Sequence, residues 1–525
     1  MDLRPNNGGL PLARVAAALG DPASGTADVT VRGITVDSRK VLPGDLFAAL
    51  PGAQVHGAHF TQQARAAGAV AVLTDPAGAA IVGDDGPALL IVDDPRSLVG
   101  VAAAEIYGHP SADLLLFGVT GTNGKTTTTW LLESGLRGAG HITGMVGTVE
   151  TQIAGQPVPS VRTTPEAAEL HALLAVMRER GVTAVAIEVS SHALSLGRVD
   201  GCVFDVVGFT QLGTDHLDFH RTADDYFEAK SRLFTPEHGR LGVICVDSDG
   251  GRRMVAESRI PTTSLATNGQ LADWSVSDVV RAETGGYSFL LRGPAGEQIP
   301  AGVSLPGRFN VANASLAIAM LHTAGVSDDN AALGVLGCEG VPGRMEQIDV
   351  GQEFMTLVDY AHTPDALTAV LTSLRRDAGG RIVVVMGSGG DRDPSKRTAM
   401  GEVTARLADV LIVTDDNPRL ENPGKIRAAI LAGARRVDEG ERAVIEEVPG
   451  RAAAIARAVA LAQPGDVVVV AGKGHEQGQE IGGHVDVFDD RAVLLEALRQ
   501  GPYSGGGVGV SSANPEDHRR PEEER

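Results

Sequence analysis

The sequence predicts an α/β protein built from three domains, and three observations lead to this class. The chain has 525 residues, which at roughly 150 residues per domain gives about three domains. Short apolar runs rich in β-branched residues recur, and each is followed by a pattern typical of a helix. These runs are Leu114–Val119, Ala184–Val189, Phe204–Phe209, Ile382–Met386, Val410–Thr414 and Val467–Ala471. Because their hydrophobicity is continuous rather than alternating, we expect strands buried on both faces, as in parallel sheets covered by helices.

Three blocks can be drawn along the chain. Residues 1–110 are expected to form a small α/β domain, and residues 111–342 a larger domain that a glycine-rich loop opens. Residues 343–500 are expected to form a third domain, because they have their own alternation of strand and helix patterns. Residues 501–525 are rich in Gly, Ser and Pro and then charged, so we expect a disordered tail there.

Composition and charge argue against several classes of protein. The formal net charge of −21 disfavours sequence-independent binding to nucleic acid, which needs a basic face, although a local basic pocket can still bind an anion. Cys202, Cys245 and Cys338 lack metal-ligand spacing and are interpreted as buried free thiols. No segment has the length of a membrane helix, and the N-terminus lacks the apolar core of a signal peptide. We therefore expect a cytoplasmic protein that does not insert into a membrane.

The segment Gly118–Thr127 (GVTGTNGKTT) follows an apolar run and precedes a helical pattern. Its glycines let several backbone N–H groups point at one anion, and the helix N-terminus adds positive potential. Lys125 can reach the outer phosphates of ATP, and the Thr126 hydroxyl can ligate Mg²⁺. The residues expected to bind ATP here are Gly121, Thr122, Asn123, Gly124, Lys125, Thr126 and Thr127. The alternative is an ordinary glycine-rich turn before a helix.

This loop departs from the generic pattern G-x-x-x-x-G-K-[ST], because Val119 stands where the first glycine is expected and Gly118 comes one place early. In the form G-x-x-G-T-x-G-K-T-T it resembles the Mur ligases, which build the peptide of the bacterial cell-wall precursor. The resemblance covers about residues 30–495 in the family's order, and is closest to the members that add diaminopimelate as the third residue. It implies a UDP-substrate domain, a central P-loop ATPase with a parallel-rich sheet, and a Rossmann-like C-terminal domain for the amino acid.

Further motifs resemble the family's contacts to its UDP-linked substrate. Val36–Arg39 followed by Pro43–Phe47 is similar to the segment that meets the uridine nucleotide, although alone it would be a turn with an N-cap serine. Thr163–Glu166 (TTPE) is similar to a substrate-binding threonine pair, although alone it is only a good helix start. Glu188–His192 ends an apolar run, which is where open α/β sheets bind ligands. The residues that the resemblance assigns to the UDP-muramyl dipeptide are Val36, Ser38, Thr163, Thr164, Ser190 and Arg198.

The resemblance also implies a magnesium site. Glu188 is expected to ligate the metal together with Thr126, and His216, in Asp215–Asp218, matches a magnesium-linked histidine. Lys230 matches a lysine that the family carbamylates, and a carbamate is an anion that suits a hard metal. Without the resemblance, Lys230 would be interpreted as a lysine on a helix surface. The expected catalytic set is Lys125, Glu188, His216 and Lys230.

Residues on the nucleoside side of ATP are expected near the boundary of the second and third blocks. Asn310, in Gly307–Asn310 and near Asn313, resembles the adenine-side segment, and Arg344 resembles a hinge arginine that faces ATP. Asp359 follows an expected strand at Phe354–Val358 and is the expected ribose contact.

The third block is expected to select the amino acid. Its Asp-Asn-Pro-Arg run resembles the signature of diaminopimelate-adding enzymes, although as a loop alone it would be a plain turn. The expected contacts are Arg392, Asp416, Asn417, Pro418, Arg419, Gly472 and Glu476. Arg419 can hold the distal carboxylate with two charge-assisted bonds, and Glu476 can accept from the distal ammonium. Lysine would leave Arg419 buried and unpaired, which would reject it.

Five positions depart from the family pattern. Gln211 stands for a usual asparagine, Leu196 for a glutamine, Ser388 for a cysteine, and Pro394–Ser395 for a basic–glycine pair. Gln211 adds a methylene at an expected substrate contact, and Leu196 is expected to remove one hydrogen bond to the substrate. None of them touches the phosphate loop or the expected metal set.

The expected reaction is ATP-dependent amide formation in peptidoglycan precursor synthesis. Mg-ATP would phosphorylate the D-glutamate carboxylate of UDP-N-acetylmuramoyl-L-alanyl-D-glutamate, and the amine of diaminopimelate, with the meso isomer favoured, would attack the acyl phosphate. We expect domain closure to bring the two together, in a monomer. The alternatives are a lysine-adding Mur ligase, a folate-polyglutamate ligase and a non-catalytic nucleotide-binding regulator. The presence of Arg419 argues against a lysine-adding ligase, and the UDP-type first block argues against a folate-polyglutamate ligase. The complete set of expected metal ligands argues against a non-catalytic regulator.

Overall fold

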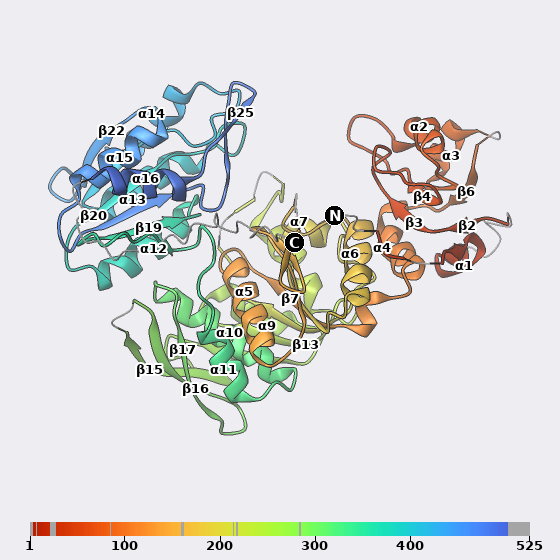
Figure 1. The fold of residues 1–525 in the computed structure, drawn as a ribbon, viewed down its shortest axis with the longest axis horizontal. Helices are drawn as coiled ribbons and strands as arrows, with labels where there is room; N and C mark the ends of the chain where they lie inside the picture. Colours follow the sequence, from red (N-terminus) through yellow and green to blue (C-terminus); the bar gives the residue numbers. More distant parts are fainter. Residues whose placement is uncertain are drawn as a thin grey trace, which may run out of the picture. The chain divides into compact units, whose positions relative to one another are not determined.

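The computed structural model of the protein describes residues 4–6, 8–20, 28–83, 86–158, 162–213, 215–216, 219–282 and 285–501. Figure 1 shows its helices and strands, coloured along the sequence. The predicted disorder of residues 502–525 falls outside the described residues, as do Leu217 and Asp218 of the Asp215–Asp218 motif.

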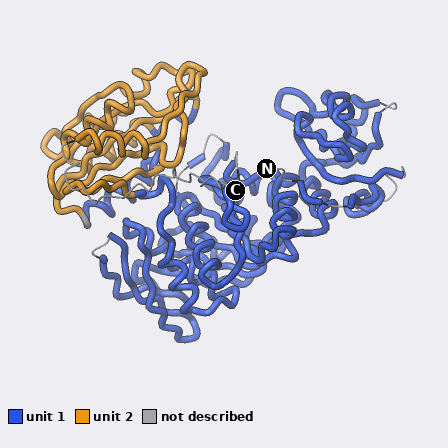
Figure 2. Tube along the Cα trace, in the orientation of Figure 1, with its two compact units in different colours: residues 1–346, 361–376, 392–396 blue, residues 347–360, 377–391, 397–525 orange. Residues whose placement is uncertain are grey.

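The chain divides into two compact units (Figure 2). Residues 1–346, 361–376 and 392–396 form unit 1, and residues 347–360, 377–391 and 397–525 form unit 2. Among the described residues, unit 1 holds two of the three main sheets, each with its own helices, and unit 2 holds the third. The domain boundaries at residues 110 and 342 stay a prediction.

The first sheet of unit 1 is small and parallel, in the order β3-β4-β5-β6. Its strands are β3 (Gly33–Thr35), β4 (Asp45–Ala48), β5 (Ala71–Thr74) and β6 (Ala88–Ile91), after the two-residue pair β1 (Leu10–Pro11) and β2 (Thr30–Val31). Its helices are α1 (Leu12–Ala18), α2 (Thr61–Ala66), α3 (Pro76–Val82) and α4 (Pro95–Ile106). Asp75 and Asp94 cap α3 and α4 and are each followed by proline, a pairing that favours helix initiation.

The second sheet of unit 1 has eleven strands in the order β10-β9-β8-β11-β7-β12-β13-β14-β15-β16-β17. The strands from β8 to β15 pair in parallel, and antiparallel strands extend both ends. Their bounds are β7 (Leu115–Thr120), β8 (Thr143–Val146), β9 (Thr151–Ile153), β10 (Gln156–Val158), β11 (Ala184–Glu188), β12 (Phe204–Phe209), β13 (Gly239–Cys245), β14 (Thr262–Ala266), β15 (Trp274–Arg281), β16 (Tyr287–Arg292) and β17 (Gln298–Val303).

Helices cover this sheet, so its central strands are buried on both faces. In β7, Phe117 and Val119 belong to one apolar cluster, and Leu116, which precedes Phe117, belongs to another. This explains the continuous apolar runs, because alternate side chains enter different cores. The helices of this region are α5 (Lys125–Gly138), α6 (Ala167–Glu179), α7 (Ser191–Ser195), α8 (Ala223–Ser231), α9 (Asp249–Glu257), α10 (Phe309–Thr323) and α11 (Asp328–Leu336).

Unit 2 is built on a six-stranded sheet in the order β18-β19-β23-β20-β21-β22, whose strands from β19 to β22 are parallel. They are β18 (Glu346–Gln347), β19 (Met355–Asp359), β20 (Ile382–Met386), β21 (Val410–Val413), β22 (Val444–Glu447) and β23 (Val467–Ala471), with a separate hairpin of β24 (Gly478–Ile481) and β25 (His484–Val487). The remaining α-helices of the described residues are α12 (Pro364–Asp377), which lies largely in unit 1, α13 (Lys396–Leu407), α14 (Pro423–Ala434), α15 (Arg451–Leu461) and α16 (Asp490–Gln500).

The structure confirms the predicted α/β class and its parallel-rich sheets. Each of the six apolar runs is a strand, displaced by at most one residue at either end. The three cysteines are buried free thiols, as predicted, and burial raises the pKa of Cys202 to about 12. None of the helices in the described ranges combines the length and apolar character needed to cross a membrane.

Candidate functional site

The glycine-rich loop joins β7 to α5, as its sequence predicts. Gly121 has φ 144° and Gly124 has φ 89°, a region that L side chains rarely adopt. A Cβ on Gly121 would lie 1.9 Å from Thr210 Oγ1, and one on Gly124 would lie 2.5 Å from Asn313 Oδ1. Both positions therefore require glycine, and the loop leads directly into the first turn of α5 at Lys125. This strand–loop–helix arrangement can present backbone N–H groups and a helix N-terminus to phosphate.

Lys125 lies against the carbonyl groups of this loop. Its Nζ donates hydrogen bonds to Gly121 O and Thr122 O, both at 2.9 Å. Desolvation lowers the pKa of Lys125, and the nearby carboxylates of Glu188 and Asp215 oppose that shift. The side chain thus lies at the loop, in position to turn toward a phosphate.

Lys230, from α8, reaches the same loop. Its Nζ donates to Gly121 O at 2.8 Å and lies 4.4 Å from the centre of the Tyr226 ring. The Tyr226 hydroxyl donates to Thr122 Oγ1 at 3.1 Å. Burial, and then the charge of Lys125, hold the pKa of Lys230 well below its usual value. The interpretation of Lys230 as a surface lysine is therefore wrong, because its side chain is buried against the loop.

Glu188 lies at the carboxyl end of β11 and holds three hydrogen bonds. Its Oε2 accepts from the hydroxyls of Thr126, at 3.0 Å, and Thr148, at 2.9 Å, and its Oε1 accepts from the Thr148 backbone N–H at 2.8 Å. Arg344 donates to Thr126 Oγ1 at 3.1 Å. Within the described residues no group of three His, Cys, Asp or Glu side chains is arranged as a metal cage. A carboxylate beside a hydroxyl nevertheless fits Mg²⁺, which commonly takes one or two protein oxygens and fills its other positions with water and phosphate.

Thr148 is a site residue that sequence reasoning missed. It follows Gly147 after β8, and β8 pairs in parallel with β11. Side chains that follow neighbouring parallel strands gather at one sheet edge, so the strand order would have indicated this residue.

His216 lies beside Tyr226 and thus near Lys230. Its ring packs edge-on against His192, with ring centres 4.7 Å apart, and its centre is 6.3 Å from that of Tyr226. Its Nε2 is 3.5 Å from Asp215 Oδ2, and its backbone is left-handed, with φ 56°. The side chain is 43% exposed.

The residues predicted to bind the dipeptide converge at the end of β11. The hydroxyl oxygens of Thr148 and Thr163 are hydrogen-bonded at 3.0 Å, and Thr164 Oγ1 donates to Glu188 O at 2.7 Å. The Ser190 N–H donates to Thr164 Oγ1 at 3.2 Å, and Arg198 donates to Thr164 O at 3.4 Å. Arg198 also pairs with Glu166 at 2.9 Å. Hydrogen bonds therefore connect the predicted dipeptide residues directly to the predicted metal ligand.

The residues predicted to bind the uridine nucleotide and the nucleoside side of ATP lie in three places. Val36 and Ser38 follow β3 in the first sheet, where Ser38 Oγ donates to Gln63 Oε1 at 3.2 Å. Asn310 accepts from Asn313 at 2.8 Å at the start of α10, and Asn313 lies against Gly124 of the phosphate loop. Asp359 ends β19 in unit 2. Gln211, which stands where the family usually has asparagine, contacts the phosphate loop through its backbone. Its carbonyl oxygen accepts from the Thr122 N–H at 2.8 Å, so this contact does not depend on the side chain.

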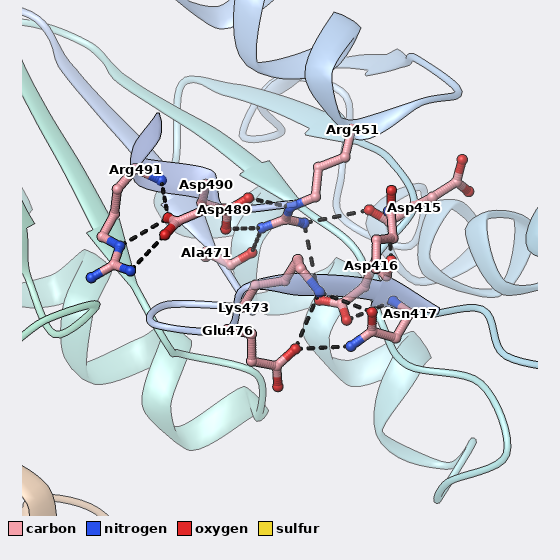
Figure 3. Close-up of polar contacts among 11 residues, drawn as sticks. Asp415, Asp416, Asn417, Arg451, Ala471, Lys473, Glu476, Asp489, Asp490 and Arg491 are labelled. Carbon is pink, nitrogen blue, oxygen red and sulfur yellow. Dashed lines mark hydrogen bonds and ion pairs between the residues drawn. The ribbon is translucent and has the colours of Figure 1, made fainter. Parts of the chain in front are cut away.

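The predicted amino-acid residues of unit 2 form one polar cluster at the ends of β21 and β23 (Figure 3). Asn417 Nδ2 donates to Glu476 Oε2 at 2.8 Å. A Cβ on Gly472 would lie 2.7 Å from Asp416 Oδ2, so only glycine allows the two segments to approach this closely. Lys473 donates to Asn417 Oδ1 at 2.9 Å and to Glu476 Oε2 at 3.1 Å. None of the motifs in the sequence had assigned it a role.

Arg419 stands at the edge of this cluster with a left-handed backbone, φ 53°. Its guanidinium donates to Gly390 O, and its Nε is 3.4 Å from Glu480 Oε2 on β24. The side chain is 24% exposed. Glu480 therefore lies within reach of the Arg419 charge, and the expectation that bound lysine would leave Arg419 buried and unpaired stays a prediction. Arg392 is exposed, and its segment, residues 392–396, belongs to unit 1 rather than to unit 2.

A buried ion pair supports the cluster from behind. Arg451, on α15, makes two 2.7 Å bonds to Asp490, the first residue of α16, and both side chains are 0% exposed. The same guanidinium donates to Ala471 O at 2.9 Å and to Asp415 O at 3.4 Å (Figure 3). Arg451 thus ties the ends of β21 and β23 together. Arg451 is the first residue of an alanine-rich helix and belongs to no motif, so the sequence offered no signal for it.

Comparison with known proteins identifies the family. The Mur ligase family, catalytic domain, matches residues 30–104; the Mur ligase middle domain matches residues 119–321; and the Mur ligase, glutamate ligase domain, matches residues 343–474.

Individual proteins match over nearly the whole chain. The UDP-N-acetylmuramoyl-L-alanyl-D-glutamate–2,6-diaminopimelate ligases of Streptomyces avermitilis and Streptomyces coelicolor are each 53% identical, over 93% of this chain and 96% of their own length. A solved structure of a ligase of that name is 30% identical and superposes with a TM-score of 0.65 over 93% of this chain and 99% of the other. The chain therefore belongs to the Mur ligase family of ATP-dependent acid–amino-acid ligases.

Proposed function

We propose that this protein adds 2,6-diaminopimelate to UDP-N-acetylmuramoyl-L-alanyl-D-glutamate, using ATP and Mg²⁺, in the synthesis of the peptidoglycan precursor. The observation that carries this proposal is the cluster of Asp416, Asn417 and Glu476 beside Arg419, in a chain 53% identical to ligases of that name. We further propose that the enzyme works as a monomer in the cytoplasm, where ATP and UDP-linked sugars are available.

The proposal assigns phosphate binding to the loop between β7 and α5. Lys125 would exchange its loop carbonyls for the outer phosphates of ATP, and the helix N-terminus would stabilise the same charge. Bound Mg²⁺ would neutralise phosphate charge as a Lewis acid, held by Thr126, Glu188, His216 and the carbamate of Lys230. Asn310, Arg344 and Asp359 are proposed to contact the nucleoside side of ATP.

The acceptor carboxylate is proposed to lie at the carboxyl end of β11. Thr163, Thr164, Ser190 and Arg198 would orient the dipeptide there, while Val36 and Ser38 would bind the uridine nucleotide. Transfer of the γ-phosphoryl group of ATP to the D-glutamate carboxylate gives an acyl phosphate and ADP. Attack by the neutral amine of diaminopimelate gives a tetrahedral intermediate, which loses a proton and expels phosphate to form the amide. No protein nucleophile is needed, so the chain contributes orientation and charge balance.

The amine donor is proposed to bind in unit 2. Arg419 can replace its contact to Gly390 O with a bidentate pair to the distal carboxylate, and Glu476 can accept from the distal ammonium. Asp416, Asn417, Pro418 and Gly472 would shape this end of the pocket, with Arg392 as a further contact. The amine and the acyl phosphate are held by different units, so the proposal includes closure of the two units during the reaction.

The deciding experiment measures phosphate release from ATP with the UDP-dipeptide and, separately, meso-diaminopimelate, LL-diaminopimelate and L-lysine. We expect turnover with meso-diaminopimelate. Turnover with lysine alone would overturn the amino-acid specificity, and no turnover with any amine would overturn the ligase assignment.

A variant at Arg419 tests the specificity argument. Loss of two charge-assisted bonds in Arg419→Ala should raise the KM for diaminopimelate by at least about 100-fold while the KM for ATP stays nearly constant. Arg436→Ala, an exposed arginine of the same unit, is the matched control and should behave as wild type. Equal losses in both KM values would contradict the role given to Arg419.

A further inference from the structure

Lys473 is a fully buried cation inside the proposed amino-acid site. It follows β23 and Gly472, and its side chain is 0% exposed. A buried ammonium group is costly unless charged and polar partners surround it. It donates to Asn417 and Glu476, which are both proposed to contact the amino acid. The buried charge of Lys473 therefore acts on two residues of the proposed amino-acid site.

The hydrogen bonds of the cluster fix the orientation of Asn417. Its Oδ1 accepts from Lys473 Nζ at 2.9 Å and from the Glu480 backbone N–H at 3.0 Å, so this atom must be the amide oxygen. The amide nitrogen is then left to donate to Glu476 Oε2 at 2.8 Å. Lys473, Asn417 and Glu476 form a closed triangle of three hydrogen bonds (Figure 3).

The two oxygens of Glu476 are not equivalent in this triangle. Oε2 accepts from both Lys473, at 3.1 Å, and Asn417, at 2.8 Å. Within the described part of the chain, no donor contacts Oε1, and the side chain is 34% exposed. One oxygen is thus committed to the protein, and the other remains available to a ligand donor.

We propose that Lys473 is a positioning residue for the amino-acid substrate, which acts by clamping Glu476 so that Oε1 receives the distal ammonium of diaminopimelate. This inference rests on the proposed function. Lys473 lies behind Glu476 and is buried, so it acts through Glu476 rather than by touching the substrate. Without its charge, Glu476 would keep only the neutral amide of Asn417 and could swing toward solvent.

The clamp also accounts for the use of lysine rather than an apolar residue. An ion pair fixes a carboxylate more firmly than a neutral donor does, because charge-assisted bonds are about twice as strong. A pre-oriented acceptor loses less side-chain entropy when the substrate binds. Lys473 therefore contributes to affinity for the amine donor without lying in the path of the reaction.

The test is the kinetics of Lys473→Met with the full chain and all three substrates. We expect the KM for meso-diaminopimelate to rise about 10- to 100-fold, with kcat and the KM values for ATP and the UDP-dipeptide changed less than about threefold. Lys425→Met removes an exposed lysine of the same unit and should leave all four parameters unchanged. A thermal melt of each variant monitors folding.

A double variant separates positioning from a general structural role. If Lys473 acts through Glu476, then Lys473→Met/Glu476→Gln should have the same KM for diaminopimelate as Glu476→Gln alone. Multiplicative effects of the two changes would overturn the inference, as would equal rises in all three KM values. The double variant also leaves no unpaired carboxylate, so it serves if Lys473→Met alone melts near the assay temperature.

The outcome also separates this inference from the proposed function. A wild-type enzyme without turnover on diaminopimelate would overturn both. A wild-type enzyme with turnover, combined with an unchanged KM for diaminopimelate in Lys473→Met, would overturn the clamp alone.

Discussion

The buried pair of Arg451 and Asp490 gives the sharpest test of how unit 2 is held together. Asp490→Asn keeps the shape of the side chain but removes its charge, which leaves the Arg451 guanidinium in the interior without its bidentate partner. Both side chains are 0% exposed and both bonds are 2.7 Å long, so water cannot replace the lost carboxylate. The nearest remaining carboxylate, Asp416, is 4.0 Å away.

The expected cost follows from this burial. Removing one partner of a buried pair destabilises a protein by about 3–5 kcal/mol. For a unit of this size, that corresponds to a fall in melting temperature of roughly 10 °C. The double variant Arg451→Met/Asp490→Leu should lose less than Asp490→Asn, because no uncompensated charge stays buried.

The assay is urea unfolding followed by circular dichroism, with Asp489→Asn as the matched control. Asp489 is the neighbouring carboxylate, caps α16 and pairs with Arg491, but both of those side chains are about one-fifth exposed. Asparagine also caps helices well, and a partly exposed pair contributes little, so this control should lose less than about 1 kcal/mol. The reasoning is refuted if Asp490→Asn is as mild as the control, or if the double variant is the least stable of the three.

Three further predictions concern residues of unit 1. Glu188→Gln should lower kcat by about 100-fold or more at saturating ATP, since the charge facing the metal is lost while the shape remains; a change confined to the KM for diaminopimelate would contradict this. Thr148→Val removes a hydroxyl bonded to Glu188 and should weaken activation by Mg²⁺ roughly 10- to 100-fold, measured by a magnesium titration of phosphate release. Burial lowers the pKa of His171 to about 4, whereas in the unfolded chain the pKa of a histidine is about 6.5. Below pH 6.5 the unfolded chain therefore binds a proton that the folded chain does not. The free energy of unfolding should have its full value above pH 6.5 and fall by roughly 3 kcal/mol toward pH 4. His171→Gln should flatten that part of the urea-unfolding pH profile, and an unchanged slope would exclude His171 as its cause.

Much of the fold could be predicted because the central strands are buried on both faces. Their runs, such as Val467–Ala471, are apolar without interruption, and such runs have few other places in a folded protein. The hairpin of β24 and β25 could not be found in this way. Its strands, Gly478–Ile481 and His484–Val487, mix polar and apolar residues and pair mainly with each other.

Residues of the candidate site could be predicted where they belong to one continuous motif. They could not be predicted where their role depends on contacts with residues far away in the sequence. The phosphate loop is one continuous segment whose glycines carry its geometry, so it could be recognised directly. Thr148 and Arg451 have no motif of their own. Each acquires its role only when the fold brings it to Glu188 or to Asp490, across 40 and 39 residues respectively. Lys230 shows the same limit, because its burial cannot be inferred from its helix alone.

The left-handed backbone at His216, Asp391 and Arg419 has a consequence for engineering this enzyme. None of the three is glycine, yet their φ angles are 56°, 50° and 53°, a conformation that costs an L-residue about 1–2 kcal/mol. Glycine would relieve that strain at each position, so a screen that rewards heat resistance would favour replacing them. The same replacements would remove a proposed metal ligand, a loop carboxylate and the proposed specificity arginine. Selection for thermostability should therefore be paired with a turnover screen, or these positions should be held fixed in the library.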